Sequence, residues 1–266
     1  MIDLDAYFAR IGYTGPRTAD LATLGAIHAL HPAAIPFENL DPLLGRPVPL
    51  GLADLQRKMV AGHRGGYCFE QNTLFQEVLQ ALGFPVTALA ARVLWMMPAG
   101  SPPSPRTHMA LQVALEDGPY LADVGFGGYL LAAPLRLVAD LEQPTPAGLL
   151  RLRQADAFHM LQARLGVEWH DVYRFTLEPQ APIDREVGNW FTSTHPNSRF
   201  RNNLLMERLT PELRLSLANK RVTRRYPDGR VETRELASPA ELGEILAEFG
   251  VEPPADMASV FARLPA

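Results

Sequence analysis

The chain carries a single cysteine, Cys68, in a setting that favours nucleophilic chemistry. Two glycines, Gly65 and Gly66, precede it and allow a tight turn and the close approach of a substrate. After it, apolar residues recur at the spacing of one helix face, at Phe75, Val78, Leu79 and Leu82. Cys68 is therefore predicted at the N-terminus of a helix, where unpaired backbone N–H groups and the helix dipole favour a thiolate. A lone cysteine is more often a small buried residue, so its partners must decide between the two interpretations.

A nucleophilic cysteine needs a base to take its proton, and the base needs a third group to fix its tautomer. His108 and Asp123 are candidates, on two predicted strands joined by a hairpin. If Asp117 and Gly118 form a two-residue turn, Asp123 lies opposite Gln112, on the face of His108 but four residues from it. That offset is roughly 13 Å of strand, so a bulge, a longer turn or a bend must close it. The alternative is a structural histidine and a turn-capping carboxylate.

The elements that must position these residues change in type along the chain. The first third is predicted to be helical, with one helix ending at Gly12, a second capped by Thr18 and ending at His31-Pro32, and a third closed by Gly62. Strands follow at 86–95, 108–115, 120–124, 149–153, 158–165 and 169–177, with a proline-rich flap at 98–105. The last third is mixed, with strands at 213–218, 221–226 and 230–236 and a helix capped by Ser238.

Composition limits the classes of function. The 266 residues are 47% hydrophobic and 20% charged with a net charge of −4, as in a soluble globular protein, and this gives no argument for nucleic-acid binding. One cysteine forms no internal disulfide, which agrees with a reducing compartment. Neither a signal peptide nor an apolar run of about 20 residues is found. We therefore expect a cytoplasmic protein without a membrane or nucleic-acid partner.

Several short motifs now resemble those of one family, the arylamine N-acetyltransferases. The stretch Arg64 to Asn72 around Cys68 is similar to their nucleophile motif. Thr107-His108-Met109 and Asp123 to Gly128 resemble the segments that complete their Cys-His-Asp triad. Pro36 to Leu40 resembles an early motif of the family, and Thr194 to Phe200 a pattern in its last third. Order, spacing and length agree, so the resemblance covers nearly the whole chain.

The resemblance implies an α+β fold with three parts. These are an N-terminal helical bundle at 1–85 carrying the nucleophile, a central antiparallel β-barrel at 86–185 carrying His108 and Asp123, and a C-terminal α/β lid at 186–266. The Cys-His-Asp arrangement would be papain-like.

The resemblance also implies an activity. Acetyl-CoA would acetylate Cys68, and an arylamine, arylhydroxylamine or arylhydrazine would take the acetyl group in a ping-pong reaction, with no metal. The resemblance implies that CoA contacts Thr107, Phe126, Gly127, Thr194 and Ser198. An aromatic acceptor pocket would be lined by Phe37, Trp95, Phe126 and Phe200. A homodimer is possible.

Basic residues concentrate in the last third, at Arg199, Arg201, Lys220, Arg221, Arg224 and Arg225. They could meet the phosphates of CoA or form a solvated face, and the sequence leaves both open.

Three alternative functions remain. An amide synthase of the same fold would take its acyl group from a donor other than acetyl-CoA. Transglutaminases and papain-like peptidases use the same Cys, His, Asp order, but the peptidase signature around the cysteine is absent. A non-enzymatic binding protein would be expected to lose Cys68.

Overall fold

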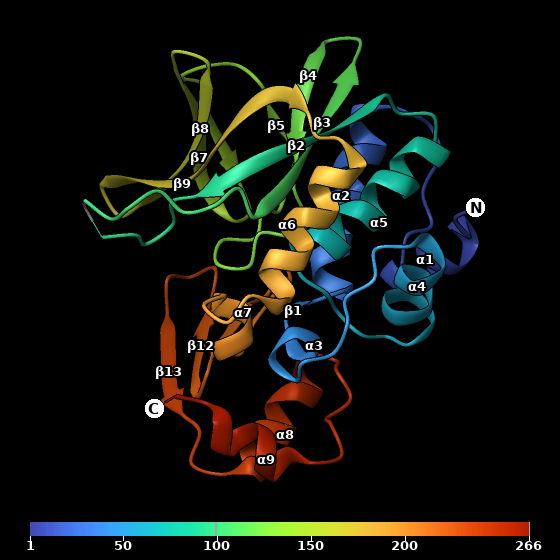
Figure 1. Ribbon diagram of the computed structural model, residues 1–266. Helices are drawn as coiled ribbons and strands as arrows, with labels where there is room; N and C mark the ends of the chain where they lie inside the picture. The colour runs from blue at the N-terminus through green and yellow to red at the C-terminus, as the bar shows by residue number, and fades with distance from the viewer. Residues whose placement is uncertain (99, 266) are drawn as a thin grey trace.

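The computed structural model describes residues 1–98 and 100–265, and it has the predicted α+β architecture. Figure 1 shows three regions: N-terminal helices, a strongly curved sheet beside them, and a second sheet with helices below. Within the described ranges, no helix is long and apolar enough to cross a membrane.

The N-terminal region is helical, as predicted. Its elements are α1 (Leu4–Ile11), α2 (Leu21–Ala34), α3 (Leu40–Leu43), α4 (Leu52–Leu55), the π-helix η1 (Gln56–Ala61) and α5 (Cys68–Ala81). Two predictions about α2 were wrong. Asp20, not Thr18, caps it, because the Asp20 carboxylate accepts the N–H of Thr23. The helix also continues past Pro32, because a proline removes one hydrogen bond yet keeps a helical φ.

The middle region is an eight-stranded antiparallel sheet in the order β5-β4-β3-β2-β9-β8-β7-β6. The strands are β2 (Val86–Val93), β3 (His108–Leu115), β4 (Gly118–Ala122), β5 (Leu135–Arg136), β6 (Glu142–Thr145), β7 (Gly148–Ala155), β8 (Phe158–Leu165) and β9 (Glu168–Pro179). The two edges meet where the Gln143 side chain accepts the N–H of Arg136 and donates to its carbonyl oxygen. The sheet thus forms the predicted, nearly closed barrel.

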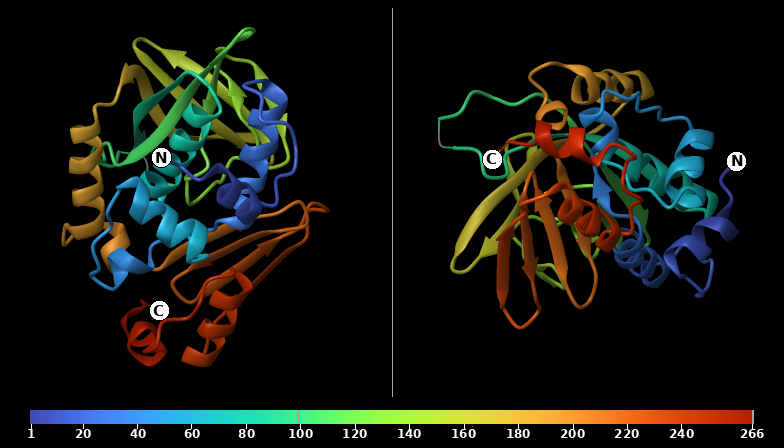
Figure 2. Two further views of the ribbon diagram at one scale, coloured as in Figure 1. Left: turned by 90° about the vertical axis from the view of Figure 1, so that its right-hand side faces the viewer. Right: turned by 90° about the horizontal axis from the view of Figure 1, so that it is seen from below.

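The last region contains the helices α6 (Pro182–Thr194), α7 (Arg199–Asn202), α8 (Pro239–Glu248) and α9 (Met257–Arg263). Its strands are β10 (Leu205–Leu209), β11 (Arg214–Ala218), β12 (Arg221–Arg225) and β13 (Val231–Glu235). Ser238 caps α8, as predicted, by accepting the N–H of Glu241. Figure 2 shows the sheet between α8 and α9 on one side and the rest of the molecule on the other.

The N-terminal third contributes a strand to this second sheet. β1 (Phe37–Glu38) pairs antiparallel with β10 at its edge, with Phe37 opposite Glu207. The predicted division at 185 falls inside α6. Division of the chain at 85 and 185 therefore stays a prediction.

A buried cluster of opposite charges lies behind the start of α5. The Lys58 ammonium is 2.7 Å from Asp41 Oδ2 and 2.7 Å from Glu70 Oε1. Nearby, Arg64 Nε and Nη2 lie 2.9 and 2.6 Å from Glu38 Oε1. Burial alone would lower the pKa of Lys58, but the surrounding carboxylates, Glu70 first, raise it above its ordinary value. With Arg46, whose Nη1 lies 3.7 Å from Asp41 Oδ1, three cations face three carboxylates.

Glu70 links this cluster to the nucleophile. Its second oxygen, Oε2, accepts the backbone N–H of Tyr67, the residue that precedes Cys68, at 3.1 Å. This is the carboxylate half of a capping box, in which the third helical residue satisfies the N–H at the helix start. Lys58 thus fixes Glu70, and Glu70 fixes the turn that presents Cys68.

We predict that Lys58→Met lowers the free energy of unfolding by about 3–5 kcal/mol, because it leaves the fully buried Glu70 without its cation. Urea denaturation would measure the change. Arg57→Met is the matched control, because the Arg57–Asp54 pair is exposed, and it should stay within about 0.5 kcal/mol of the wild type. Equal stabilities for the two variants would contradict this role of Lys58.

Candidate active site

The structure brings Cys68, His108 and Asp123 together. Cys68 is the first residue of α5, His108 is the first residue of β3, and Asp123 directly follows β4. The Nε2–H of His108 donates to Asp123 Oδ2 at 2.6 Å, so Nδ1 is left to face the Cys68 thiol. Cys68 Sγ also lies 3.5 Å from the carbonyl oxygen of Thr107. The arrangement is buried, with exposed fractions of 3%, 2% and 0% for Cys68, His108 and Asp123.

The expected hairpin register was wrong by two residues. The turn is Glu116-Asp117, because Leu115 pairs with Gly118 and Leu111 pairs with Ala122. Gly118 ends this turn at a φ of +122°, a conformation that other residues rarely adopt. The strand therefore reaches Asp123 two residues closer to His108 than predicted. Side chains on one face at the ends of β3 and β4 then cover the remaining distance.

Both carboxylate oxygens of Asp123 accept hydrogen bonds. While Oδ2 binds His108, Oδ1 accepts the Asn72 side-chain amide and the Gly125 N–H, each at 2.9 Å. The backbone N–H of Asp123 donates to His28 Nε2 at 3.1 Å. Burial of a carboxylate removes its hydration, and these hydrogen-bond donors compensate for that loss.

The electrostatics favour a charged pair. Burial alone would lower the pKa of His108, but the Asp123 charge and hydrogen bond, with smaller contributions from Cys68, raise it to about 10. Burial alone would raise the pKa of Asp123, yet His108 and the hydrogen bonds from Asn72 and Gly125 hold it below its usual value. The imidazolium and the carboxylate thus stabilise each other. Among the described residues, no three His, Cys, Asp or Glu side chains are grouped to hold a metal ion.

Three supporting residues were not assigned from the sequence. Asn72 lies in the Cys68 stretch, one helical turn after the nucleophile, and that spacing could have indicated its role. His28, on α2, accepts the Asp123 N–H. Tyr173, from β9, places its ring 4.8 Å from that of His108, and burial and the Asp123 charge keep its pKa well above the ordinary value. Nothing local in the sequence marks Tyr173.

Cys68 and His108 open into a cavity of about 320 Å³, here called the active-site cavity. Seven of the predicted binding residues line it, namely Phe37, Trp95, Thr107, Phe126, Gly127, Ser198 and Phe200. Thr194 does not; it is exposed at the end of α6, where its hydroxyl donates to the Trp190 carbonyl. Val93, Phe191, Asn197 and Leu205 line the cavity without having been predicted.

The turn after Asp123 packs against two walls of the site. A Cβ on Gly125 would lie 2.8 Å from the Cys68 Cα, and one on Gly127 would lie 2.2 Å from the Phe37 ring. Real Cβ atoms do not approach so closely, so both positions need glycine. The turn therefore holds Cys68, Asp123 and Phe37 in one rigid unit.

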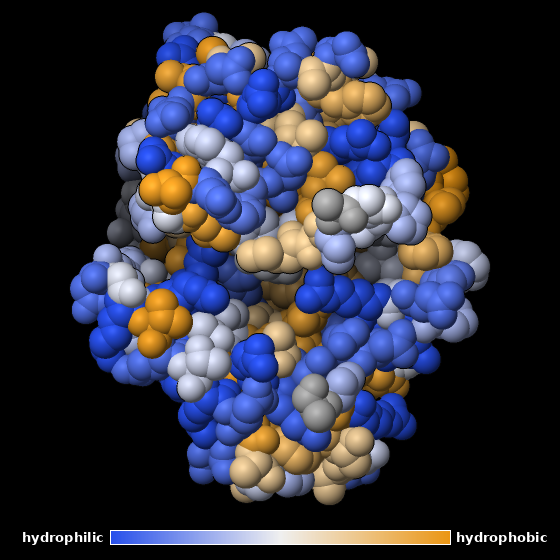
Figure 3. Space-filling view, turned by 90° about the vertical axis from the view of Figure 1, so that its left-hand side faces the viewer, coloured by the Kyte–Doolittle hydropathy of each residue, from blue (hydrophilic) through white to orange (hydrophobic). Residues whose placement is uncertain are grey.

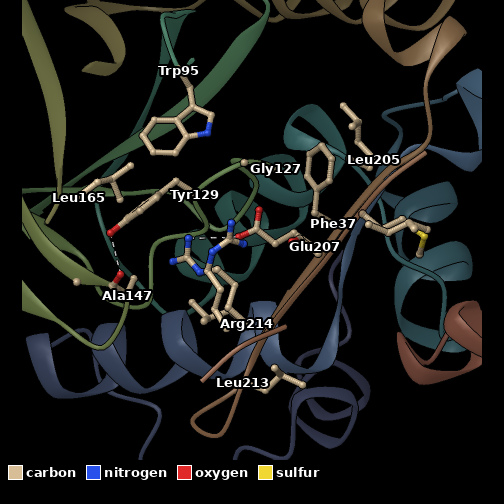
Figure 4. Close-up of a pocket in the computed structure, with 18 of the residues that line it drawn as sticks. Phe37, Trp95, Gly127, Tyr129, Ala147, Leu165, Leu205, Glu207, Leu213 and Arg214 are labelled. Atoms are coloured by element: carbon tan, nitrogen blue, oxygen red, sulfur yellow. Dashed lines mark hydrogen bonds and ion pairs between the residues drawn. The ribbon is translucent and has the colours of Figure 1, made fainter. Parts of the chain in front are cut away.

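A second, larger cavity of about 590 Å³ adjoins the first, and we call it the lid cavity. It lies between the barrel and the second sheet, where Figure 3 shows a hollow in the surface. Figure 4 shows Trp95 and Tyr129 on its barrel side and the side chains of Glu207 and Arg214 extending toward each other on its sheet side. The two cavities share Phe37, Trp95, Gly127, Arg199 and Leu205.

The predicted basic residues divide into two groups. Arg221 and Arg224 pair with Glu235 and Glu248, Arg201 donates to the Pro42 carbonyl, and Lys220 lies over the Phe261 ring. Arg199 and Arg225 instead line the lid cavity, where no described residue accepts a hydrogen bond from either guanidinium. Only these two members of the set are free to meet a ligand there.

We predict that Asp123→Asn slows alkylation of Cys68 by iodoacetamide roughly 10³-fold at neutral pH. Both carboxylate oxygens accept N–H donors, so an amide nitrogen must face either His108 or the pair formed by Asn72 and Gly125. Asp117→Asn is the control, since Asp117 lies in the exposed turn and binds Tyr120. A near-normal alkylation rate in Asp123→Asn would remove the residue from the triad.

Comparison with known proteins agrees with this geometry. A family model described as N-acetyltransferase matches residues 20–254. The arylamine N-acetyltransferase of Escherichia coli is 44% identical over 251 residues, which are 93% of this chain and 88% of that protein. The arylamine N-acetyltransferase of Mycolicibacterium smegmatis is 43% identical over 94% of this chain and 92% of its own.

Solved structures show the same fold over the full length. M. smegmatis arylamine N-acetyltransferase superposes with a TM-score of 0.95 at 41% identity, with all of both chains covered. The enzyme of M. marinum in complex with CoA gives 0.90 at 37% identity, covering 97% of this chain and 94% of that one. The family model spans most of the chain and the E. coli and M. smegmatis relatives exceed 40% identity, so this chain belongs to the arylamine N-acetyltransferase family.

Proposed function

We propose that this protein transfers the acetyl group of acetyl-CoA to the amine of an aromatic amine, hydroxylamine or hydrazine through an acetyl-Cys68 thioester. The observation that carries the proposal is the buried Cys68–His108–Asp123 arrangement at the base of a cavity with aromatic walls. The E. coli and M. smegmatis relatives are arylamine N-acetyltransferases, which supports the same substrate class here.

In the first half-reaction the Cys68 thiolate attacks the thioester carbonyl of acetyl-CoA. The new bond forms between Sγ and the carbonyl carbon, the bond from that carbon to the CoA sulfur breaks, and the CoA thiolate takes the proton from His108 Nδ1. A thiolate exchanges readily with a thioester, because attacking and leaving groups are both sulfur. Asp123 stabilises the imidazolium before the proton moves.

The developing oxyanion needs hydrogen-bond donors close to Sγ. The backbone N–H groups of Cys68 and Phe69 begin α5, so they have no carbonyl partner within the helix. They also lie at the positive end of the helix dipole. We therefore assign them as the candidate oxyanion donors.

In the second half-reaction the amine nitrogen attacks the acetyl carbon, His108 accepts its proton, and Cys68 leaves as a thiolate. Water competes for the same intermediate, so the site must exclude it. Met97, just before the flap, and Ser104 and Pro105 within it cover one side of the active-site cavity. Phe191 and Thr192 of α6 cover another. The acceptor would stack against Phe37, Trp95, Phe126 and Phe200, which line the same space.

The nucleotide end of the donor is proposed to lie in the lid cavity. A pantetheine arm can pass from Cys68 beside Gly127, where the two cavities join, and Arg199 and Arg225 supply unpaired cations for the phosphates. Thr107, Phe126, Gly127 and Ser198 remain proposed contacts of the arm, and Thr194 stays a prediction. A homodimer and a cytoplasmic location also stay predictions.

We predict that acetyl-CoA alone adds one acetyl group to the intact protein, because acylation precedes acceptor binding. Intact-mass spectrometry would show the adduct on the wild type, and Cys68→Ala should show none. Arylamine should then remove it. Absence of the adduct at near-stoichiometric donor would favour the amide-synthase alternative, in which another acyl donor is required.

We predict that Arg225→Gln raises the KM for acetyl-CoA about tenfold, the loss expected for one charge-assisted hydrogen bond. Turnover with p-nitrophenyl acetate should not change, because that donor has no phosphate. Arg221→Gln is the control, since Arg221 lies on the same strand but is paired with Glu235. Equal KM values for Arg225→Gln and the wild type would place the phosphates elsewhere without affecting the acetyl-Cys68 proposal.

A further inference from the structure

The arginines without a hydrogen-bond acceptor or a carboxylate within ion-pair distance, among the residues that the structure describes, are not scattered. They are Arg92, Arg106, Arg164, Arg174, Arg199, Arg225 and Arg263. Arg164, Arg199 and Arg225 line the lid cavity, where the donor's phosphates are proposed to bind. Arg92, Arg106 and Arg174 form a second cluster at a different place, to which the acetyl transfer assigns no role.

This second cluster is built by the barrel itself. Arg92 on β2 and Arg174 on β9 are direct cross-strand partners, and together with Arg106 they line one small recess on the outer face of the barrel. Like charges opposite each other on adjacent strands destabilise a sheet. The effect is visible at Arg92, whose pKa is lowered by burial and by the charges of Arg174 and Arg106.

Arg106 is exposed and Arg92 and Arg174 are partly buried, but solvent does not satisfy the whole cluster. Arg174 Nε is buried and has no hydrogen-bond partner among the described residues, and its guanidinium lies 5.0 Å above the Phe158 ring. A buried donor without an acceptor is unfavourable, so a missing acceptor is expected at this position. Arg92 and Arg174 also line an open groove of about 570 Å³ that runs beneath the flap. Its further polar walls are Ser101, Ser104, Gln162, His170 and Asp171, and the Asp171 carboxylate accepts a hydrogen bond from the Gln162 amide.

We propose that Arg92, Arg106 and Arg174 bind an oxyanion of the phosphate or sulfate class, free or carried by a small molecule, at a site separate from that of the acetyl donor. Planar guanidinium groups match the geometry of such an anion, and a doubly charged phosphate removes the repulsion among the three cations. None of the three lines the active-site cavity or the lid cavity, so the ligand is held outside both.

The position of the cluster gives the anion a structural effect. Arg106 directly follows the flap and directly precedes Thr107 and His108. Met97 and Ser104 line both the groove and the active-site cavity, so the two spaces lie on either side of this loop. A bound anion would fasten the flap end to β2 and β9 beside the triad.

Thermal unfolding with inorganic phosphate at constant ionic strength tests the proposal without any activity measurement. For the wild type we expect the Tm to rise by on the order of 3 °C at millimolar phosphate, and the rise to persist with saturating CoA. Arg92→Gln should remove this rise. In buffer without oxyanions the same variant should unfold at an equal or higher Tm than the wild type, because it relieves the like-charge contact. Arg174→Gln should repeat both results.

Arg221→Gln and Arg263→Gln serve as controls, because each replaces an arginine that lies outside the cluster and lines neither the active-site cavity nor the lid cavity. Both should keep the response of the wild type to phosphate. The proposal is overturned if phosphate produces no shift, or if all four variants keep the same shift, which would show a general salt effect. Loss of the shift at saturating CoA would also overturn it, because the cluster would then be a part of the donor site.

Discussion

The buried hydrogen bond between His108 and Asp123 is the interaction on which the rest of the site depends. A carboxylate with no solvent exposure needs donors on every side, and the chain supplies them from α5, from the glycine turn and from β3. A helix, a hairpin and a turn must therefore meet at one residue. The end of the barrel can pack against the N-terminus of α5 because Gly125 has no side chain. A Cβ at this position would lie 2.8 Å from the Cys68 Cα.

Charge is handled differently on the two sides of the nucleophile. Behind α5, the Lys58 and Arg64 cations are fully matched by buried carboxylates, and this half of the site is rigid scaffold. Toward the second sheet, Arg199 and Arg225 have no carboxylate partner among the residues at 1–98 and 100–265. Cations paired with carboxylates stabilise the structure, and cations without such partners are available to ligands. The net charge of −4 sums over both kinds, so it gave no indication of an anionic substrate.

The sequence predicted correctly those features that depend only on neighbouring residues. Glycines before Cys68, an apolar helix face after it and the Ser238 cap each act within a few residues, and the structure confirms them. The hairpin register depends on which residues form the turn, and there the expectation failed by two residues. Tyr173 and the lid cavity depend on packing between distant segments, so no local pattern could indicate them. Family motifs located Phe37 and Phe200, whose rings meet 5.9 Å apart across the site.

The pairing of β1 with β10 has a consequence for the order in which the molecule is made. Phe37 belongs to an early segment, yet its strand partner Glu207 lies far along the chain. On the ribosome, the first helices can pack while this short strand still has an unpaired edge. The aromatic wall of the active site is therefore completed only after the barrel has been synthesised, so an incomplete chain can contain Cys68, His108 and Asp123 and still lack a finished pocket.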